Sequence, residues 1–136
     1  MKNMILKCLS CLCLPVLAAC GTDNAGKVDA VADESRTLLP LAMDALTTWT
    51  DVEVDHEGKS VGMKMDIAGS TADFDNLQAL VDSIHGDVVS QLKIHGMSEP
   101  IVRVPVEAGY SLVYYYVSDA GGDTVATAIF RPDELK

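Results

Sequence analysis

Basic residues are scarce in this sequence, which has 10 Lys and Arg against 20 Asp and Glu and a formal net charge of −10. Proteins that bind nucleic acids or anionic headgroups electrostatically need clustered Lys and Arg, because these residues neutralise phosphate charge. We therefore expect no nucleic-acid partner. A cationic partner is compatible with this charge balance.

Cysteine is confined to the first twenty residues, where it occurs as Cys8, Cys11, Cys13 and Cys20. The rest of the chain offers no disulfide, no thiol nucleophile and no cysteine-ligated metal site. Aromatic residues are also few, at 5% of the sequence, with a single Trp. The stability of the folded part must come from packing and hydrogen bonds.

A long hydrophobic run is missing as well. The uncharged run from Cys8 to Ala19 is well short of the roughly 20 apolar residues that a membrane-spanning helix needs. It follows Lys2 and Lys7, and it ends in small residues. A basic start, a short apolar stretch and small residues at the end are the three parts of a secretory signal peptide.

The residues Leu17, Ala18, Ala19 and Cys20 resemble a bacterial lipobox, the recognition site of lipoprotein signal peptidase. The resemblance implies cleavage before Cys20 and a diacylglyceryl group on the Cys20 sulfur, often with acylation of the new amino group. Two or three acyl chains anchor a protein stably, whereas one chain holds only marginally. Gly21 rather than Asp follows Cys20, which by the same resemblance implies sorting to the outer membrane and display on its periplasmic face.

The predicted domain organisation follows from this cleavage. Residues 1–19 are the signal peptide, residues 20–27 are the lipidated Cys20 and a small, polar, flexible tether, and residues 28–136 are one globular domain. Removing residues 1–19 from the 136 leaves 117 residues. Lys2 and Lys7 leave with the signal, so the remainder has 8 basic and 20 acidic residues, a formal charge of −12.

Hydrophobic periodicity predicts the elements of the globular domain. Apolar residues at a three-to-four spacing predict a helix from Val28 onward, interrupted near Pro40, and a second helix over 70–94 that weakens at Gly86. Alternation predicts a hairpin of strands 47–55 and 61–67, a short edge strand over 101–106, and strands 110–117 and 124–130.

These elements predict an α+β fold. We expect a small antiparallel sheet of about four to five strands, with two helices packed on one face and the order α-β-β-α-β-β-β. The stretch 109–116, the later glycines with the closing strand, and Leu39 with Pro40 before the first strand resemble small exported bacterial proteins of unassigned function. The resemblance supports the architecture and implies no activity.

Candidate catalytic and metal-binding residues do not form a recognisable set. His85 and His95 are too far apart along one helix to share a metal, and His56 is placed at a hairpin tip. Asp51, Glu53 and Asp55 occupy one strand face and fail the EF-hand template, so we interpret them as a solvated row or a partner contact. We expect no metal, no cofactor, no catalytic residue and no enzymatic activity.

The strand over 110–117 carries the best candidate interaction surface. Tyr110, Tyr114 and Tyr116 share one face with Leu112, and Tyr115 is on the other face with Val113 and Val117. An aromatic stripe of this kind either walls the core or binds proteins and glycans, and both interpretations stay open.

The functional hypothesis combines the anchor with the domain. We expect a non-catalytic envelope lipoprotein, lipid-anchored at the outer membrane, whose α+β domain binds a protein partner. Assembly, inhibitor and immunity roles all fit. The alternative is a ligand-binding or enzymatic lipoprotein that acts on envelope polymers or lipids, which a deep pocket lined by Tyr114, Tyr116 and helix residues would favour.

Overall fold

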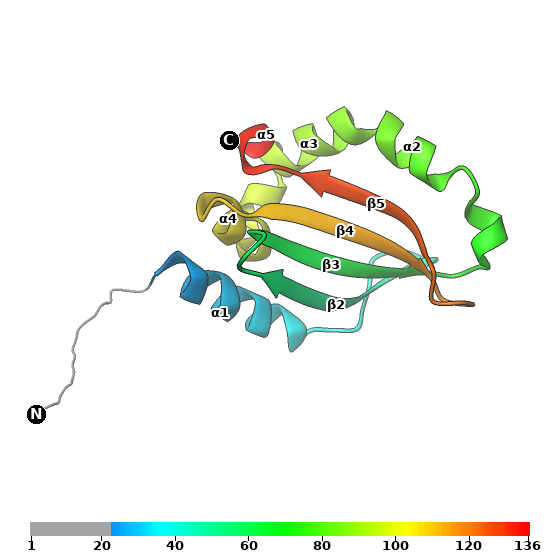
Figure 1. The fold of residues 1–136 in the computed structure, drawn as a ribbon, viewed down its shortest axis with the longest axis horizontal. Helices are drawn as coiled ribbons and strands as arrows, with labels where there is room; N and C mark the ends of the chain where they lie inside the picture. The colour runs from blue at the N-terminus through cyan, green and yellow to red at the C-terminus, as the bar shows by residue number, and fades with distance from the viewer. Residues whose placement is uncertain (1–22) are drawn as a thin grey trace, which may run out of the picture.

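The structure, a computed structural model, describes residues 23–136, and Figure 1 shows the course of the chain through one mixed sheet and its helices. The residues predicted to form the signal peptide and the lipobox lie outside the described residues. The elements in chain order are α1 (Asn24–Arg36), β1 (Leu41–Ala42), β2 (Thr47–Asp55), β3 (Ser60–Ile67), the 3-10 helix η1 (Thr71–Phe74), α2 (Leu77–Ser83), α3 (His85–Ile94), the 3-10 helix η2 (Gly96–Ser98), α4 (Pro100–Glu107), β4 (Ser111–Ser118), β5 (Thr124–Phe130) and α5 (Pro132–Leu135).

The five strands form one sheet in the order β1-β2-β3-β4-β5. All neighbours are antiparallel except β3 and β4, which run parallel in register from Ser60↔Ser111 to Ile67↔Ser118. The α+β class and the number of strands are confirmed, but the sheet is mixed rather than antiparallel. The long helical segment between β3 and β4 carries the chain back to the end of the sheet where β3 begins, as a parallel pair requires.

The segment predicted as an edge strand over 101–106 is a helix, α4. Pro100 occupies its first turn, where the missing amide proton costs nothing, and Val102, Pro105 and Val106 are buried on one side. The chain is helical here because residues four apart, Val102 and Val106, both reach the core. Five α-helices therefore replace the two that were expected in the part of the chain that the structure describes.

The first helix is shorter and starts earlier than the hydrophobic pattern indicates. The Asp23 carboxylate accepts a hydrogen bond from the backbone amide of Gly26 and caps α1, so residues 24–27 are helical rather than part of a tether. The expected interruption before Pro40 is confirmed, since α1 ends at Arg36. The expected weak point near Gly86 is also confirmed, because α2 and α3 are separated at Ile84.

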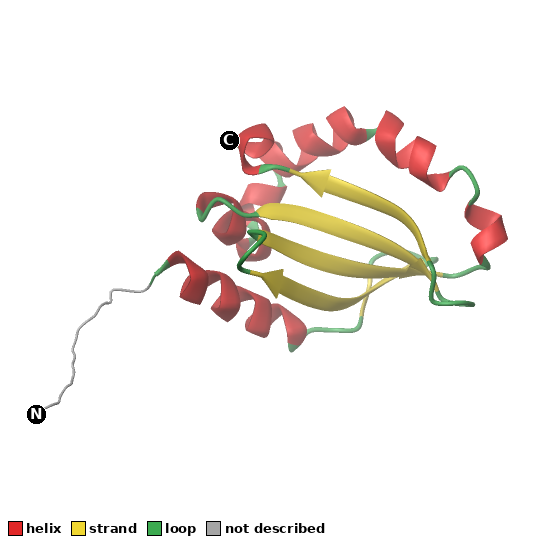
Figure 2. Ribbon diagram, viewed as in Figure 1, coloured by secondary structure: helices red, strands yellow, loops and turns green. Residues whose placement is uncertain are grey.

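The core lies between the helices and one face of the sheet. Alternate residues of β2 to β5 pack against α1, α4 and α5, with Leu112 and Phe130 among the largest fully buried side chains. Burial of one such side chain contributes about 1.5–3 kcal/mol. Figure 2 shows the strands side by side with helices along both sides of the sheet and behind it, so the opposite face of the sheet is open.

Side chains from helices close two of the strand edges. Gln78 on α2 donates to the Thr127 carbonyl at 2.9 Å and accepts from the Thr127 amide at 2.8 Å, as a neighbouring strand would. Arg36 on α1 donates to the Val52 carbonyl at 3.0 and 2.8 Å. Unpaired backbone groups at a strand edge can pair with a strand of another chain, and the contacts of Gln78 and Arg36 occupy such groups on β5 and β2.

Over residues 23–136, no helix combines the length and the apolar character that crossing a membrane demands.

Candidate interaction site

The three tyrosines predicted as an interaction surface lie on the covered face of the sheet. Tyr110 is 3% exposed, and Tyr114 and Tyr116 are half-buried and pack against the core. Burial, with a smaller contribution from Tyr116, raises the pKa of Tyr114 to about 12, and burial also raises the pKa of Tyr116. This stripe is a wall of the core, and the exposed tyrosine of the strand is Tyr115.

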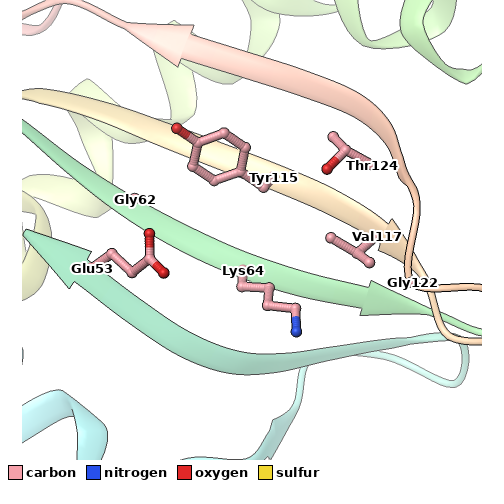
Figure 3. Close-up of a pocket in the computed structure, with 7 residues that line it drawn as sticks. All are labelled: Glu53, Gly62, Lys64, Tyr115, Val117, Gly122 and Thr124. Carbon is pink, nitrogen blue, oxygen red and sulfur yellow. The ribbon is translucent and has the colours of Figure 1, made fainter.

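Tyr115 stands on the open face of the sheet, above a glycine. A Cβ on Gly62 would come within 2.9 Å of the Tyr115 ring, so the absence of a side chain at Gly62 lets the ring lie across β3. A shallow hollow of about 330 Å³ lies beside this ring. Figure 3 shows the ring together with Glu53 and Lys64, which also line the hollow. Ile129, on neighbouring β5, is 50% exposed. The open face thus offers one aromatic ring and charges of both signs.

The acidic row of β2 also lies on this face. Glu53 and Asp55 are exposed, Asp51 is half-buried, and Asp51 is paired in register with Lys64. Lys64 therefore lies opposite the row, on the neighbouring strand β3. Exposed pairs of this type contribute only a few tenths of a kcal/mol to stability, so the row is left available to solvent or to a partner.

Two of the three histidines, His56 and His85, hold parts of the fold together. His56 at the β2–β3 turn contacts the Tyr110 hydroxyl at 2.7 Å through Nδ1 and the Asp29 carboxylate at 2.8 Å through Nε2. Since Asp29 is on α1 and Tyr110 precedes β4, this bridge joins three segments.

His85 stacks on Phe130 with ring centroids 4.8 Å apart, and its Nε2 lies 3.3 Å from the Glu134 carboxylate. The backbone amide of Arg131 donates to this carboxylate and lowers the Glu134 pKa, and the contacts with His85 and the Arg131 charge act in the same direction. Within residues 23–136 no three His, Cys, Asp or Glu side chains come together as a metal would need.

A second hollow, of about 260 Å³, lies where α1, β1 and the start of α4 meet, and we call it the α1–β1 groove. It is lined by Val31, Glu34, Ser35, Leu38, Leu41, Trp49, Glu99, Pro100 and Ile101. Leu38 is 63% exposed and Leu41 41% exposed. Met43 and Leu46, further along the same connection, are 53% and 62% exposed.

The groove was not expected, because the helical pattern that starts at Val28 includes Leu38, Leu41 and Leu46 and so predicts them on a buried helix face. The signal that was available is Pro40, which ends the helical pattern and so removes the reason to expect those residues on a buried helix face. Large apolar side chains that are exposed together, as Leu38 and Leu41 are at the groove, mark a candidate interaction site.

No protein-family model matches the chain, and no curated protein is significantly similar to it in sequence. Two solved structures share the fold. A protein from Pseudomonas aeruginosa assigned as secreted has a TM-score of 0.65 at 16% identity, with 83% of this chain and 93% of that chain covered. EpsS, the pilotin of the type 2 secretion system from Vibrio vulnificus, has a TM-score of 0.53 at 11% identity, with 83% and 94% covered. At these identities the chain is similar to both proteins in fold alone.

Proposed function

We propose that this protein is a non-catalytic envelope lipoprotein, anchored through lipid on Cys20 at the periplasmic face of the outer membrane, whose domain binds a protein partner. The residues Leu17, Ala18, Ala19 and Cys20 support the anchor. The formal charge of −12 on the remaining chain disfavours direct contact of the domain with anionic headgroups. The lipid then holds the protein at the membrane, and the domain is free to bind elsewhere.

The observation that carries the binding role is the exposed apolar surface at the α1–β1 groove. Apolar side chains exposed together and rimmed by polar residues are typical of protein–protein contacts. Leu38 and Leu41, which both line the groove, are 63% and 41% exposed. Their exposure costs free energy in the isolated domain, and a partner that covers them recovers it.

The fold of EpsS supports an accessory role of this kind. EpsS is a pilotin of a type 2 secretion system, and the chain covers most of that protein at a similar overall shape. We infer that the domain serves as an accessory of an envelope assembly, and inhibitor or immunity roles remain compatible with the same binding surface. The exported neighbour from Pseudomonas aeruginosa is consistent with a location beyond the cytoplasm.

Ligand binding is the second candidate, and the hollow beside Tyr115 favours it. Its volume of about 330 Å³ is at the lower end of the roughly 300–1,000 Å³ that small-molecule sites occupy. Tyr114 and Tyr116, which would line a deep pocket on the other face, pack against the core instead. The balance therefore favours a binding module for proteins.

The anchor is tested with Cys20→Ala in the full chain, compared with Cys13→Ala as a matched control. We expect the Cys20 variant to lose labelled palmitate and to leave the outer-membrane fraction, while the control keeps both. Palmitate incorporation by the Cys20 variant would overturn the anchor.

The binding role is tested separately by chemical crosslinking of the native lipoprotein in intact membranes. We expect a discrete adduct with one other protein. Absence of any adduct, together with a defined small molecule retained in native mass spectrometry, would replace this proposal by ligand binding.

A further inference from the structure

We propose that the α1–β1 groove binds the apolar face of a basic amphipathic helix of the partner, with one or two apolar side chains inserted beside Trp49. This inference rests on the proposed function and names the partner's chemistry and its place on the domain.

The groove has the form that receives a helix. Val31, Ser35 and Leu38 follow one side of α1 at helical spacing, with Leu38 just past its end. Pro100 and Ile101 at the start of α4 form the opposite wall. An amphipathic helix that lies in a groove between helices presents side chains at the same three-to-four spacing, so its apolar face matches this surface.

The size of the groove favours inserted side chains over a free small molecule. Its volume of about 260 Å³ is below the roughly 300–1,000 Å³ of typical small-molecule sites. Trp49 is only 8% exposed, so an inserted side chain would complete its burial. Anchors seated in well-packed pockets of this kind carry most of the free energy of a protein interface.

Charge determines the second property of the partner. Two acidic residues line the groove: Glu34 on α1, and Glu99, which directly precedes α4. The residues that line the groove include no Lys or Arg. Arg36, on the same helix, is already bonded to Asp33 and to the Val52 carbonyl. Since the described residues also have 20 acidic against 8 basic side chains, a partner helix with Lys or Arg beside its apolar face is attracted and oriented.

The same acidic residues argue against the groove as a membrane contact. A surface that inserts into anionic lipid carries Lys and Arg around its apolar residues, and here the rim is acidic. The groove is also concave, and a side chain that projects from a helix fits a hollow more closely than a flat bilayer surface does. A protein segment satisfies both the shape and the charge.

The inference is tested with Trp49, the single tryptophan of the chain, as the reporter. The intact lipoprotein in nanodiscs of zwitterionic lipid is titrated with a synthetic tryptophan-free helix of about 18 residues, roughly five turns, with leucine on one face and lysine on the other. We expect a saturable change in Trp49 emission. A peptide with glutamate in place of lysine should bind at least about tenfold more weakly, which corresponds to about 1.4 kcal/mol.

Two double variants locate the binding. Leu38→Ser with Leu41→Ser should weaken binding of the lysine peptide about tenfold or more. Leu80→Ser with Ile84→Ser is the matched control, because these residues of the α2–α3 region are 55% and 41% exposed and lie away from the groove. Equal affinity for both double variants, or equal binding of the lysine and glutamate peptides, would overturn the inference.

Photo-crosslinking in the producing cells separates this inference from the proposed function. A benzoylphenylalanine replaces Leu38 in one full-length variant and Ile129, on the open face, in another, and adducts are mapped by mass spectrometry. A peptide adduct at position 38 whose sequence is a basic amphipathic helix supports the inference. An adduct at position 38 with phospholipid, with a second copy of this chain or with an acidic segment overturns it. Protein adducts found only at position 129 would contradict binding in the groove but would agree with the proposed function. Absence of a protein adduct at both positions would contradict the inference and the proposed function alike.

Discussion

Gln78 is predicted to stabilise the domain by acting as a substitute strand neighbour for β5. The change Gln78→Ala removes two hydrogen bonds with Thr127, at 2.9 and 2.8 Å. Each such bond contributes about 0.5–1.5 kcal/mol net, and solvent exposure places these two at the lower end, since water replaces the lost partner. We expect the free energy of unfolding to fall by about 1–2 kcal/mol. The better helix propensity of Ala offsets a few tenths of a kcal/mol of this loss.

Urea unfolding monitored by Trp49 fluorescence measures this loss, and calorimetry gives the change in Tm. For a domain of this size, about 1 kcal/mol shifts Tm by roughly 3–5 °C, so the variant should melt about 3–8 °C lower. Light scattering during size-exclusion chromatography should also detect self-association, because the amide and carbonyl of Thr127 become available to another strand.

Gln91→Ala is the matched control, since Gln91 is an exposed glutamine on α3 in the same helical region. We expect its unfolding free energy to stay within about 0.5 kcal/mol of the parent chain. If Gln78→Ala unfolds at the same urea concentration as Gln91→Ala and stays monomeric, the edge contact has no energetic role and this reasoning is wrong.

Three further predictions concern the sheet and its titrating groups. Gly62→Ala should destabilise the domain by about 1–3 kcal/mol, because the new Cβ would meet the Tyr115 ring at 2.9 Å, and Tyr115→Ala should relieve most of that loss in the double variant. In an absorbance titration at high pH, the phase near pH 12 should disappear in Tyr114→Phe, and its persistence would contradict the burial of this hydroxyl. Because the pKa of Glu134 is lowered in the folded state, its ionised carboxylate stabilises the fold above about pH 4.5, and this contribution is lost as the pH falls through the lowered pKa. The variant Glu134→Gln should therefore lose less unfolding free energy between neutral and acid pH than the parent chain does.

Local patterns predicted most of the strands, because regular alternation of apolar and polar residues is typical of a strand with one buried face. The hairpin of β2 and β3 is confirmed by its register from Thr47↔Ile67 to Asp55↔Ser60, and the pair β4 and β5 is confirmed as well. The parallel pairing of β3 with β4 could not be predicted in this way, since it depends on where a long helical connection returns the chain. Hydrophobic periodicity reports which face of an element is apolar, and it contains no information on the neighbouring strand.

The error at α4 has a physical cause in its residue types. Ile101, Val102, Val104 and Val106 are β-branched and favour strands in isolation, yet tertiary packing of Val102 and Val106 outweighs that preference. Pro105 also suggested an edge strand, although a short helix tolerates a proline in its last turn. The better signal was Pro100 as a first-turn residue.

The candidate site was the least predictable part, because exposure is a property of the whole fold. The sequence correctly separates Tyr115 from Tyr110, Tyr114 and Tyr116, but it cannot say which set solvent reaches. It likewise cannot show that Leu38 and Leu41 find no place in the core. Only the assembled position of α1, β1 and α4 reveals the groove between them.

The bridge from Asp29 through His56 to Tyr110 has a mechanical consequence. A pull on the chain at the N-terminal side of α1 acts along a helix that is fastened at several points: at Asp29, at the buried Val28 and Ala32, and at Arg36. Figure 1 shows α1 lying along β2, so such a load shears these contacts together rather than peeling them one after another. Contacts loaded in parallel share the force, and a domain held from this end would resist extraction better than the strength of any single contact suggests.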